Sequence, residues 1–392
     1  MVQHRCLRRA ASVVGVALTL VIAGCGLESD PLAFNDPDES GSVVETPDLV
    51  EGDASGADDD ASTATSEPEL GPEDEAGGSD ELGAAPPVPT GPTAPLTGQP
   101  VDDPALASRS ALAIKIDNHV SARPQWGLLD ADIVFDYRAE GVTRFMAVYH
   151  SQLPETIGPV RSSRTSDFDL LTALGTPLYA SSGGNDIVMS RLRSVDAVAV
   201  TDQTESAYYR TSGRPAPHNL VVDPRDLYAA ATGDGHQGAP PPAWFEFRNA
   251  EGASAEVARG AAVSTAEVEI DFTGSPTVRF EWDAAQTGWI RLQDGQLHVA
   301  AESGEPLAPR NVVIMVTDYR TSSADAASPE LVSVGSGAAY ALVDGRVIEG
   351  TWSRLSPADT PTLTDLDDEQ IVLAPGQTWV LFPQPGQVTI FD

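Results

Sequence analysis

Residues 111–119 read ALAIKIDNH and residues 131–149 read ADIVFDYRAEGVTRFMAVY, and these two stretches decide the fold. Both contain runs of apolar and β-branched residues that end abruptly in polar ones. Such runs, bounded by Asp, Asn and Gly, predict strands over 111–116, 132–137 and 144–149. The segment Glu140–Arg144 joins the last two as a tight turn, so polar side chains are expected at the strand ends.

Strand and helix patterns alternate from here to residue 232. Further strands are predicted over 178–181 and 197–200. Helices are predicted over 166–174, 186–193 and 224–231, where Ser166 and Asp169 have capping-box spacing and Pro224 follows a capping Asp. This alternation predicts an α/β domain with a layered, mixed sheet over 109–232.

The pattern changes after residues 233–243, a Gly/Pro-rich run (GDGHQGAPPPA) that is typical of a linker. Helix signals fade, and Asp294-Gly295 and Asp344-Gly345 suit two-residue hairpin turns. A mostly antiparallel β C-terminal domain is therefore predicted over 244–392. Its expected strands are 267–272, 277–282, 289–293, 296–300, 311–317, 338–343, 346–352, 371–373, 378–382 and 388–391.

Residues 1–25 have the parts of a secretion signal. Three arginines lie within the first nine residues, and residues 10–24 carry no charge. This apolar run is shorter than the roughly 20 residues that a permanent membrane helix needs. It ends in VIAGC at 21–25, which resembles a bacterial lipobox, so lipidation of Cys25 and anchoring on the extracytoplasmic face of the cell membrane are predicted. The alternative is an ordinary signal peptide with a chance cysteine.

Residues 26–108 contain 21 Asp or Glu and no Lys or Arg, which predicts a disordered acidic tether. Residues 109–392 are acidic as well, with 20 Lys or Arg against 37 Asp or Glu. A nucleic-acid partner is therefore not expected. The chain has two cysteines, and Cys6 leaves with the signal, so neither an internal disulfide nor cysteine-based metal chemistry is expected.

Strong catalytic and cofactor motifs are absent, including the nucleotide-binding Gly-rich loop, G-x-S-x-G and H-E-x-x-H. The histidines are scattered, so no metal site, no cofactor and no catalytic residue are predicted. The informative polar residues instead follow strands or lie in loops. Arg161 and Arg164 precede a predicted helix, where backbone N–H groups and guanidinium donors favour an anion. The candidate ligand-binding residues are Asp117, Asn118, His119, Arg123, Glu140, Arg144, Arg161, Arg164, His218 and Asn219. The alternative is that these arginines form structural ion pairs.

Several of these motifs together resemble the YerB-like lipoproteins, a bacterial family of unknown function. The similarity extends over about residues 109–391. It implies an α/β domain followed by a β-rich domain and brings no established catalytic residues. Beside Gly141, where relatives usually carry a second glycine, this sequence has Glu140. The motifs are DNH (117–119), ARPQ (122–125), ADIV (131–134), EGVTRF (140–145), IGPVRS (157–162), PHN (217–219), RNV (310–312), GTWSR (350–354) and PGQTW (375–379).

Three functions remain open. The chain is expected to be a membrane-anchored lipoprotein that binds an anionic cell-wall component or lipid-linked phosphate. The first alternative is a scaffold that binds an envelope protein through exposed strand edges. The second is a phosphate-handling envelope enzyme with Asp117, Glu140 or His218 as acid or base. Convergence of these residues with Arg144 and Arg161 favours a ligand site or an enzyme, whereas dispersal favours the scaffold.

Overall fold

The computed structural model describes residues 93–391, apart from 102, 202–205, 237, 249–261 and 265–266. Cys25, the predicted signal and nearly all of the predicted tether lie outside these residues. The first half contains α1 (Pro104–Ser108), β1 (Leu112–Ile116), β2 (Ile133–Arg138), β3 (Thr143–Tyr149), α2 (Asp167–Thr172), β4 (Leu178–Ser181), α3 (Asp186–Leu192), β5 (Val198–Thr201), β6 (Tyr208–Arg210), β7 (Leu220–Val222) and α4 (Pro224–Gly233), with 3₁₀ turns at Val120–Ala122 and Leu128–Asp130.

The second half is built from strands. They are β8 (Ala262–Ser264), β9 (Glu267–Asp271), β10 (Thr277–Asp283), β11 (Gly288–Gln293), β12 (Gln296–Leu297), β13 (Asn311–Met315), β14 (Tyr319–Thr321), β15 (Pro329–Leu331), β16 (Gly335–Val343), β17 (Arg346–Arg354), β18 (Thr362–Asp365), β19 (Thr378–Leu381) and β20 (Val388–Phe391).

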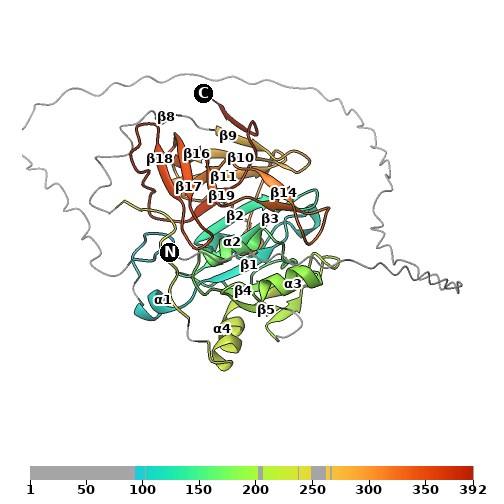
Figure 1. Ribbon diagram of the computed structural model, residues 1–392. Helices are drawn as coiled ribbons and strands as arrows, with labels where there is room; N and C mark the ends of the chain where they lie inside the picture. Colours follow the sequence, from blue (N-terminus) through green and yellow to red (C-terminus); the bar gives the residue numbers. More distant parts are fainter. Residues whose placement is uncertain are drawn as a thin grey trace, which may run out of the picture. The chain divides into compact units, whose positions relative to one another are not determined.

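One mixed sheet runs through both halves of the chain. Within the described residues it has 11 strands in the order β18-β17-β16-β13-β19-β2-β3-β1-β4-β5, with β8 paired to β17. The two halves meet where β19 pairs in parallel with β2, placing Thr378 opposite Ile133 and Leu381 opposite Asp136. Figure 1 shows this junction between the orange-to-red strands and the cyan-to-green ones.

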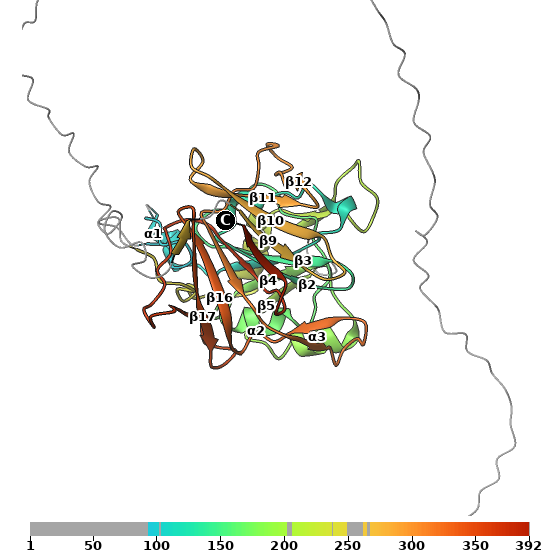
Figure 2. The ribbon, with the colours of Figure 1, turned by 90° about the horizontal axis from the view of Figure 1, so that it is seen from above.

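Different elements pack on the two faces of the large sheet. On one face, Phe135 of β2 and Val148 of β3 share a core with Phe168 of α2 and Val188 of α3. The opposite face packs on a five-stranded antiparallel sheet, β12-β11-β10-β9-β20, whose Trp289 is fully buried. Figure 2 shows the large sheet between α2 and α3 on one side and β9–β11 on the other. Strands covered on both faces tend to be apolar along their whole length. β1 to β4 are buried almost throughout, but Lys115, Asp136 and Arg144 interrupt their apolar runs.

The layer between the two sheets also holds a fully buried ion pair. Arg291 Nη2 of β11 lies 2.9 Å from Asp136 Oδ2 of β2, and both side chains are 0 % exposed. Arg291 Nη1 also donates to Gln293 Oε1 at 2.7 Å and to His298 Nδ1 at 2.5 Å. Burial, partly offset by Asp136, lowers the pKa of Arg291 to about 10. These contacts link the C-terminal strands to the centre of the large sheet.

The predicted fold class is confirmed: a mixed sheet with few helices is followed by mainly antiparallel sheets. Two local predictions are wrong. Residues 371–373 form no strand, since only Leu373 makes an isolated bridge, with Phe247. Ser166 does not cap α2, because its hydroxyl bonds Leu331 N and Pro329 O instead. Among the described helices, none is both long and apolar enough to cross a membrane.

The Asp136–Arg291 pair gives a direct stability prediction. Arg291→Ala should lower the free energy of unfolding by about 3–5 kcal/mol, because Asp136 is left as an uncompensated buried charge. Asp136→Ala/Arg291→Ala should cost less than the sum of the two single changes. Urea denaturation measures both.

Arg279→Ala is the control. Arg279 pairs with Glu267 and Glu269 on the half-exposed face of β10 and β9. Its removal should leave the urea midpoint nearly unchanged, since surface pairs contribute little. An equally small effect for Arg291→Ala would contradict a strongly coupled buried pair.

Candidate functional site

Strand directions bring several polar groups to one edge of the large sheet. β1 and β4 are parallel, and β3 is antiparallel to both β1 and β2. The carboxyl ends of β1, β2 and β4 therefore share an edge with the start of β3. Asp117 follows β1, Glu140 follows β2, Ser182 follows β4, and Arg144 is the second residue of β3. Loops at such an edge are where α/β sheets commonly hold ligands.

Asp117 is the buried centre of this edge, with a side chain only 2 % exposed. Its Oδ2 atom lies 2.8 Å from His218 Nδ1 and 3.4 Å from Arg161 Nε. Its Oδ1 atom accepts a hydrogen bond from the backbone N–H of His119 at 3.0 Å. One carboxylate thus holds residues from three separate loops.

The rings of His119 and His218 are stacked. Their centroids are 4.4 Å apart and their planes differ by 16°. The backbone N–H of Ser121 donates to His119 Nδ1 at 3.1 Å, which fixes that ring from its other side. Burial and the neighbouring His218 lower the pKa of His119. The Nε2 atoms of both rings have no hydrogen-bond partner among the described residues.

Glu140 organises a second group beside the first. Its carboxylate accepts hydrogen bonds from Arg144 Nη2 at 2.9 Å, from Arg164 Nη2 at 3.0 Å and Nε, and from the hydroxyl of Ser328. Burial alone would raise the pKa of Glu140, but Arg164 and Arg144 outweigh it and hold the pKa at about 2. Glu140 is therefore a permanent carboxylate that neutralises much of the charge of two arginines.

Arg144 connects the two groups. Its Nη1 atom donates to the carbonyl of Ser162 at 3.3 Å, next to Arg161. The side chain is 7 % exposed, and its buried Nε has no hydrogen-bond partner within the described chain. Burial and the charge of Arg164 lower the pKa of Arg144 to about 10.

The start of α2 is occupied by the chain's own carboxylate. Asp167 accepts hydrogen bonds from Lys115 Nζ at 2.8 Å and from the Tyr137 and Tyr179 hydroxyls, each at 2.6 Å. The backbone N–H of Arg164 also donates to Asp167, at 2.8 Å. Burial, partly offset by Asp167, lowers the pKa of Lys115 to about 8. Asp167 therefore engages Lys115 and the backbone N–H of Arg164.

The loop that carries His218 is tied down by its neighbours. Asn219, only 9 % exposed, accepts from Arg210 Nη1 at 2.8 Å and donates to the carbonyls of Thr211 and Arg214. Arg214 donates to the carbonyls of Ala122 and Pro124 at 2.7 and 2.6 Å. Asn219 therefore shapes the loop, and Arg214 fastens it to the loop that follows β1.

The C-terminal half also contacts the loop that follows β1. His298 Nε2 bonds Gln125 Oε1 at 2.7 Å, and Gln125 Nε2 donates to the carbonyl of Asp117 at 2.9 Å. Asn118 is fully buried and donates to Thr143 Oγ1 at 2.9 Å. Arg123 donates to the carbonyl of Asn118 and lies 3.7 Å from Asp294. The buried Arg291 group is thereby linked, through His298 and Gln125, to the backbone of Asp117.

Most of the candidate residues converge. Asp117, His119, Arg161 and His218 form one group, and Glu140, Arg144 and Arg164 form the adjoining one. Asn118, Arg123 and Asn219 hold the loops. Sequence reasoning missed the supporting roles of His298 and Ser328, because their partners Gln125 and Glu140 lie 173 and 188 residues away in the chain. It also missed Gln125, whose amide donates to the carbonyl of Asp117 eight residues earlier.

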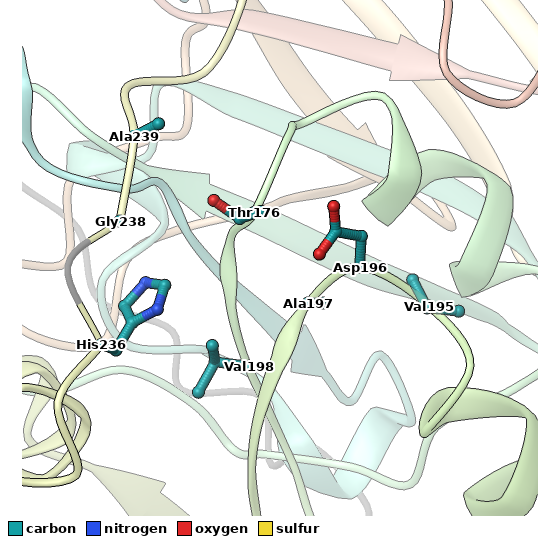
Figure 3. Close-up of a pocket in the computed structure, with 8 residues that line it drawn as sticks. All are labelled: Thr176, Val195, Asp196, Ala197, Val198, His236, Gly238 and Ala239. Carbon is teal, nitrogen blue, oxygen red and sulfur yellow. The ribbon is translucent and has the colours of Figure 1, made fainter.

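A surface pocket of about 380 Å³ lies elsewhere. Figure 3 shows it lined by Thr176, residues 195–198 and His236. Thr176 precedes β4 and Ala197 precedes β5, so the pocket lies at the amino ends of these strands, opposite the Asp117 edge. His236 there bonds Ser110 Oγ at 3.0 Å. Within the described residues, no cluster of three or more His, Cys, Asp or Glu is arranged to hold a metal.

Comparison with known proteins bears on the same residues. Residues 96–237 match the N-terminal domain, and residues 268–380 the C-terminal domain, of the protein of unknown function DUF3048. The chain is 29 % identical over 296 residues to YerB of Bacillus subtilis, covering 73 % of this chain and 85 % of YerB. This chain belongs to the YerB-like family.

The family assignment extends to three dimensions. The crystal structure of Bacillus subtilis YerB superposes with a TM-score of 0.66 at 25 % identity, covering 76 % of this chain and 99 % of that one. The name of YerB describes a lipoprotein, and the family description assigns no function. The YerB-like relationship therefore accounts for both halves of the fold and leaves the activity open.

Glu140 predicts how stability depends on pH. Because its pKa in the folded protein lies below the ordinary value of 4.5, its contribution is present above about pH 4.5 and is lost as pH falls toward 2. After allowance for partial exposure this contribution is about 1–2 kcal/mol. Glu140→Gln should therefore be less stable than wild type at pH 7, and the difference should shrink as pH falls from 5 to about 2.

Urea unfolding at several pH values measures this difference. Glu349→Gln is the control, since no described side chain pairs with Glu349, and its small effect should not vary in this way. A Glu140→Gln difference that stayed constant down to about pH 2 would contradict the ion-pair account.

Proposed function

We propose that this YerB-like chain is a lipid-anchored envelope protein that binds an anionic, phosphate-bearing ligand at the Asp117 edge. The state of Arg161 carries the proposal. Its side chain is 26 % exposed and lies beside Asp117, yet it makes no hydrogen bond within the described residues. Arg144 and Arg164 both donate hydrogen bonds to Glu140, so Arg161 is the only one of these three arginines whose guanidinium is not hydrogen-bonded within the described residues.

Local charge supports the same reading. Four arginines at this edge, Arg123, Arg144, Arg161 and Arg164, face three carboxylates, Asp117, Glu140 and Asp294. Within these ion pairs the arginines outnumber the carboxylates by one, whereas residues 109–392 as a whole carry 37 acidic against 20 basic side chains. An anion that approaches an acidic protein is attracted mainly where positive side chains outnumber negative ones.

Three further side chains that can donate hydrogen bonds belong to the loops at this edge: His119, Ser162 and Ser182. His119 Nδ1 accepts from Ser121, so a neutral His119 carries its proton on Nε2. The hydroxyls of Ser162 and Ser182 lie 3.3 Å apart in the loops after residue 161 and after β4. Guanidinium, imidazole N–H and hydroxyl groups together match the acceptor oxygens of a phosphate.

Location is the second part of the proposal. The lipobox ends at Cys25, and acylation there would place the folded region on the extracytoplasmic face of the membrane. A lipid-linked phosphate or an anionic cell-wall polymer would then be within reach. The convergence of Asp117, Arg161 and His218 favours this ligand role over a protein-binding scaffold.

Ligand-induced stabilisation tests the site. Inorganic polyphosphate should raise the melting temperature of the wild type, since ligand at about a hundredfold excess over Kd stabilises the native state by about 2.7 kcal/mol. Arg161→Ala should abolish this shift. It should cost little stability without ligand, because His218 remains hydrogen-bonded to Asp117.

The matched control is Arg225→Ala. Arg225 is an exposed arginine at the start of α4, and its removal should leave the polyphosphate shift intact. The site is rejected if Arg161→Ala loses about 3–5 kcal/mol without ligand, as a structural buried pair would, and the wild type shows no shift.

Anchoring is tested at Cys25. Cys25→Ser should lose incorporation of a fatty-acid probe and should accumulate unprocessed or be released, because the acyl acceptor is absent. Metabolic labelling followed by membrane fractionation measures both. Equal labelling of the variant and the wild type would contradict the lipoprotein assignment.

A further inference from the structure

The stacked histidines differ in the way their protons are placed. His218 Nδ1 faces Asp117 Oδ2 at 2.8 Å, so this nitrogen donates, and in the neutral ring Nε2 carries the lone pair. His119 Nδ1 accepts from the backbone N–H of Ser121, so His119 Nε2 carries the proton. One ring therefore presents a proton acceptor and its neighbour, 4.4 Å away, presents a donor.

We propose that this edge is catalytic and that His218 is a general base for hydrolysis of a phosphodiester anion. The proposal rests on the anion site of the proposed function and adds a reaction to it. Asp117 is a positioning residue: it is buried, fixes the tautomer of His218 and stabilises the imidazolium that forms. Arg161 and His119 Nε2 are placed to stabilise negative charge on the phosphoryl oxygens.

The reaction balances with water as the second reactant. His218 Nε2 removes a proton from water as the water oxygen forms a bond to phosphorus. The bond from phosphorus to the leaving oxygen breaks, and that oxygen departs with the electron pair. The products are a phosphomonoester and an alcohol or phenol, and the proton on His218 is returned to the leaving oxygen through solvent.

Other groups at the edge are unsuited to this role. Glu140 is held by Arg164 and Arg144 with a pKa of about 2, which makes it a very weak base at neutral pH. His298 is fully buried with both ring nitrogens engaged, and His150 is fully buried as well. His236 lies at the opposite end of the strands, in the pocket of Figure 3. His218 is 14 % exposed and oriented by a carboxylate.

The test uses the full-length lipidated protein in detergent with bis(p-nitrophenyl) phosphate as the substrate. Release of p-nitrophenolate should be saturable in the wild type. His218→Gln should lower kcat by about 100-fold to 10,000-fold, the range of a lost general base, while polyphosphate still raises its melting temperature. Added imidazole should restore part of the rate to His218→Gly, which distinguishes a lost base from a misfolded variant.

Asp117→Asn tests the positioning role separately. It should lower kcat more than it changes KM and should move the inflection of the pH–rate profile, neither of which a purely structural contact predicts. His236→Gln is the matched histidine control and should retain the full rate.

Two results would overturn the proposal. Polyphosphate stabilisation of the wild type without phenolate release above that of His218→Gln would reject catalysis and leave the binding function standing. Absence of both stabilisation and release would reject the two together.

Discussion

The parallel pairing of β2 with β19 is the constraint on which the rest of the molecule depends. It makes one sheet from two parts of the chain that are more than 200 residues apart, and it sets Asp136 opposite Leu381. The five-stranded sheet is then laid over β2, where Arg291 meets Asp136 at 2.9 Å. Without that partner Asp136 would be an unpaired charge in the core, at a cost of several kcal/mol. From Arg291 the contacts continue through His298 to the backbone of Asp117.

At the carboxyl edge of the sheet the chain neutralises most of its own charges. Glu140 holds two arginines, and Asp167 fills the start of α2 together with Lys115 and two tyrosines. Asp117 is different, because it orients groups that face outward: Arg161 with open donors, and a histidine whose second nitrogen is free among the described residues. Because most of the ten candidate residues are hydrogen-bonded or ion-paired within the protein, only a few of them have donors or acceptors left for a ligand. These unpartnered donors and acceptors are the basis of the proposed binding site and of the proposed reaction.

The sequence predicted the strands well where apolar and β-branched runs end in polar residues, as in β1 to β4. The prediction of a helix cap at Ser166 was wrong because a tertiary contact replaces it: the hydroxyl of Ser166 accepts a hydrogen bond from Leu331 N and does not cap its own helix. Short strands such as β6 and β14 have too few residues to show a periodicity. The candidate arginines and carboxylates could be recognised from the sequence, but their pairing could not. Glu140 pairs with Arg144 and Arg164 because the folded sheet brings the ends of these segments together. Support from His298, 173 residues beyond Gln125, has no local signal at all.

The central claim is that Asp117 determines which ring nitrogen of neutral His218 carries the proton. Long-range ¹H–¹⁵N spectra of the histidine rings measure this directly, with His218→Gln and His119→Gln used to assign the signals. The account predicts that neutral His218 carries its proton on Nδ1 and neutral His119 on Nε2, and that Asp117→Asn removes the preference of His218. A neutral His218 protonated on Nε2 in the wild type would contradict the account, because the ring would then offer no base to the outer side of the site.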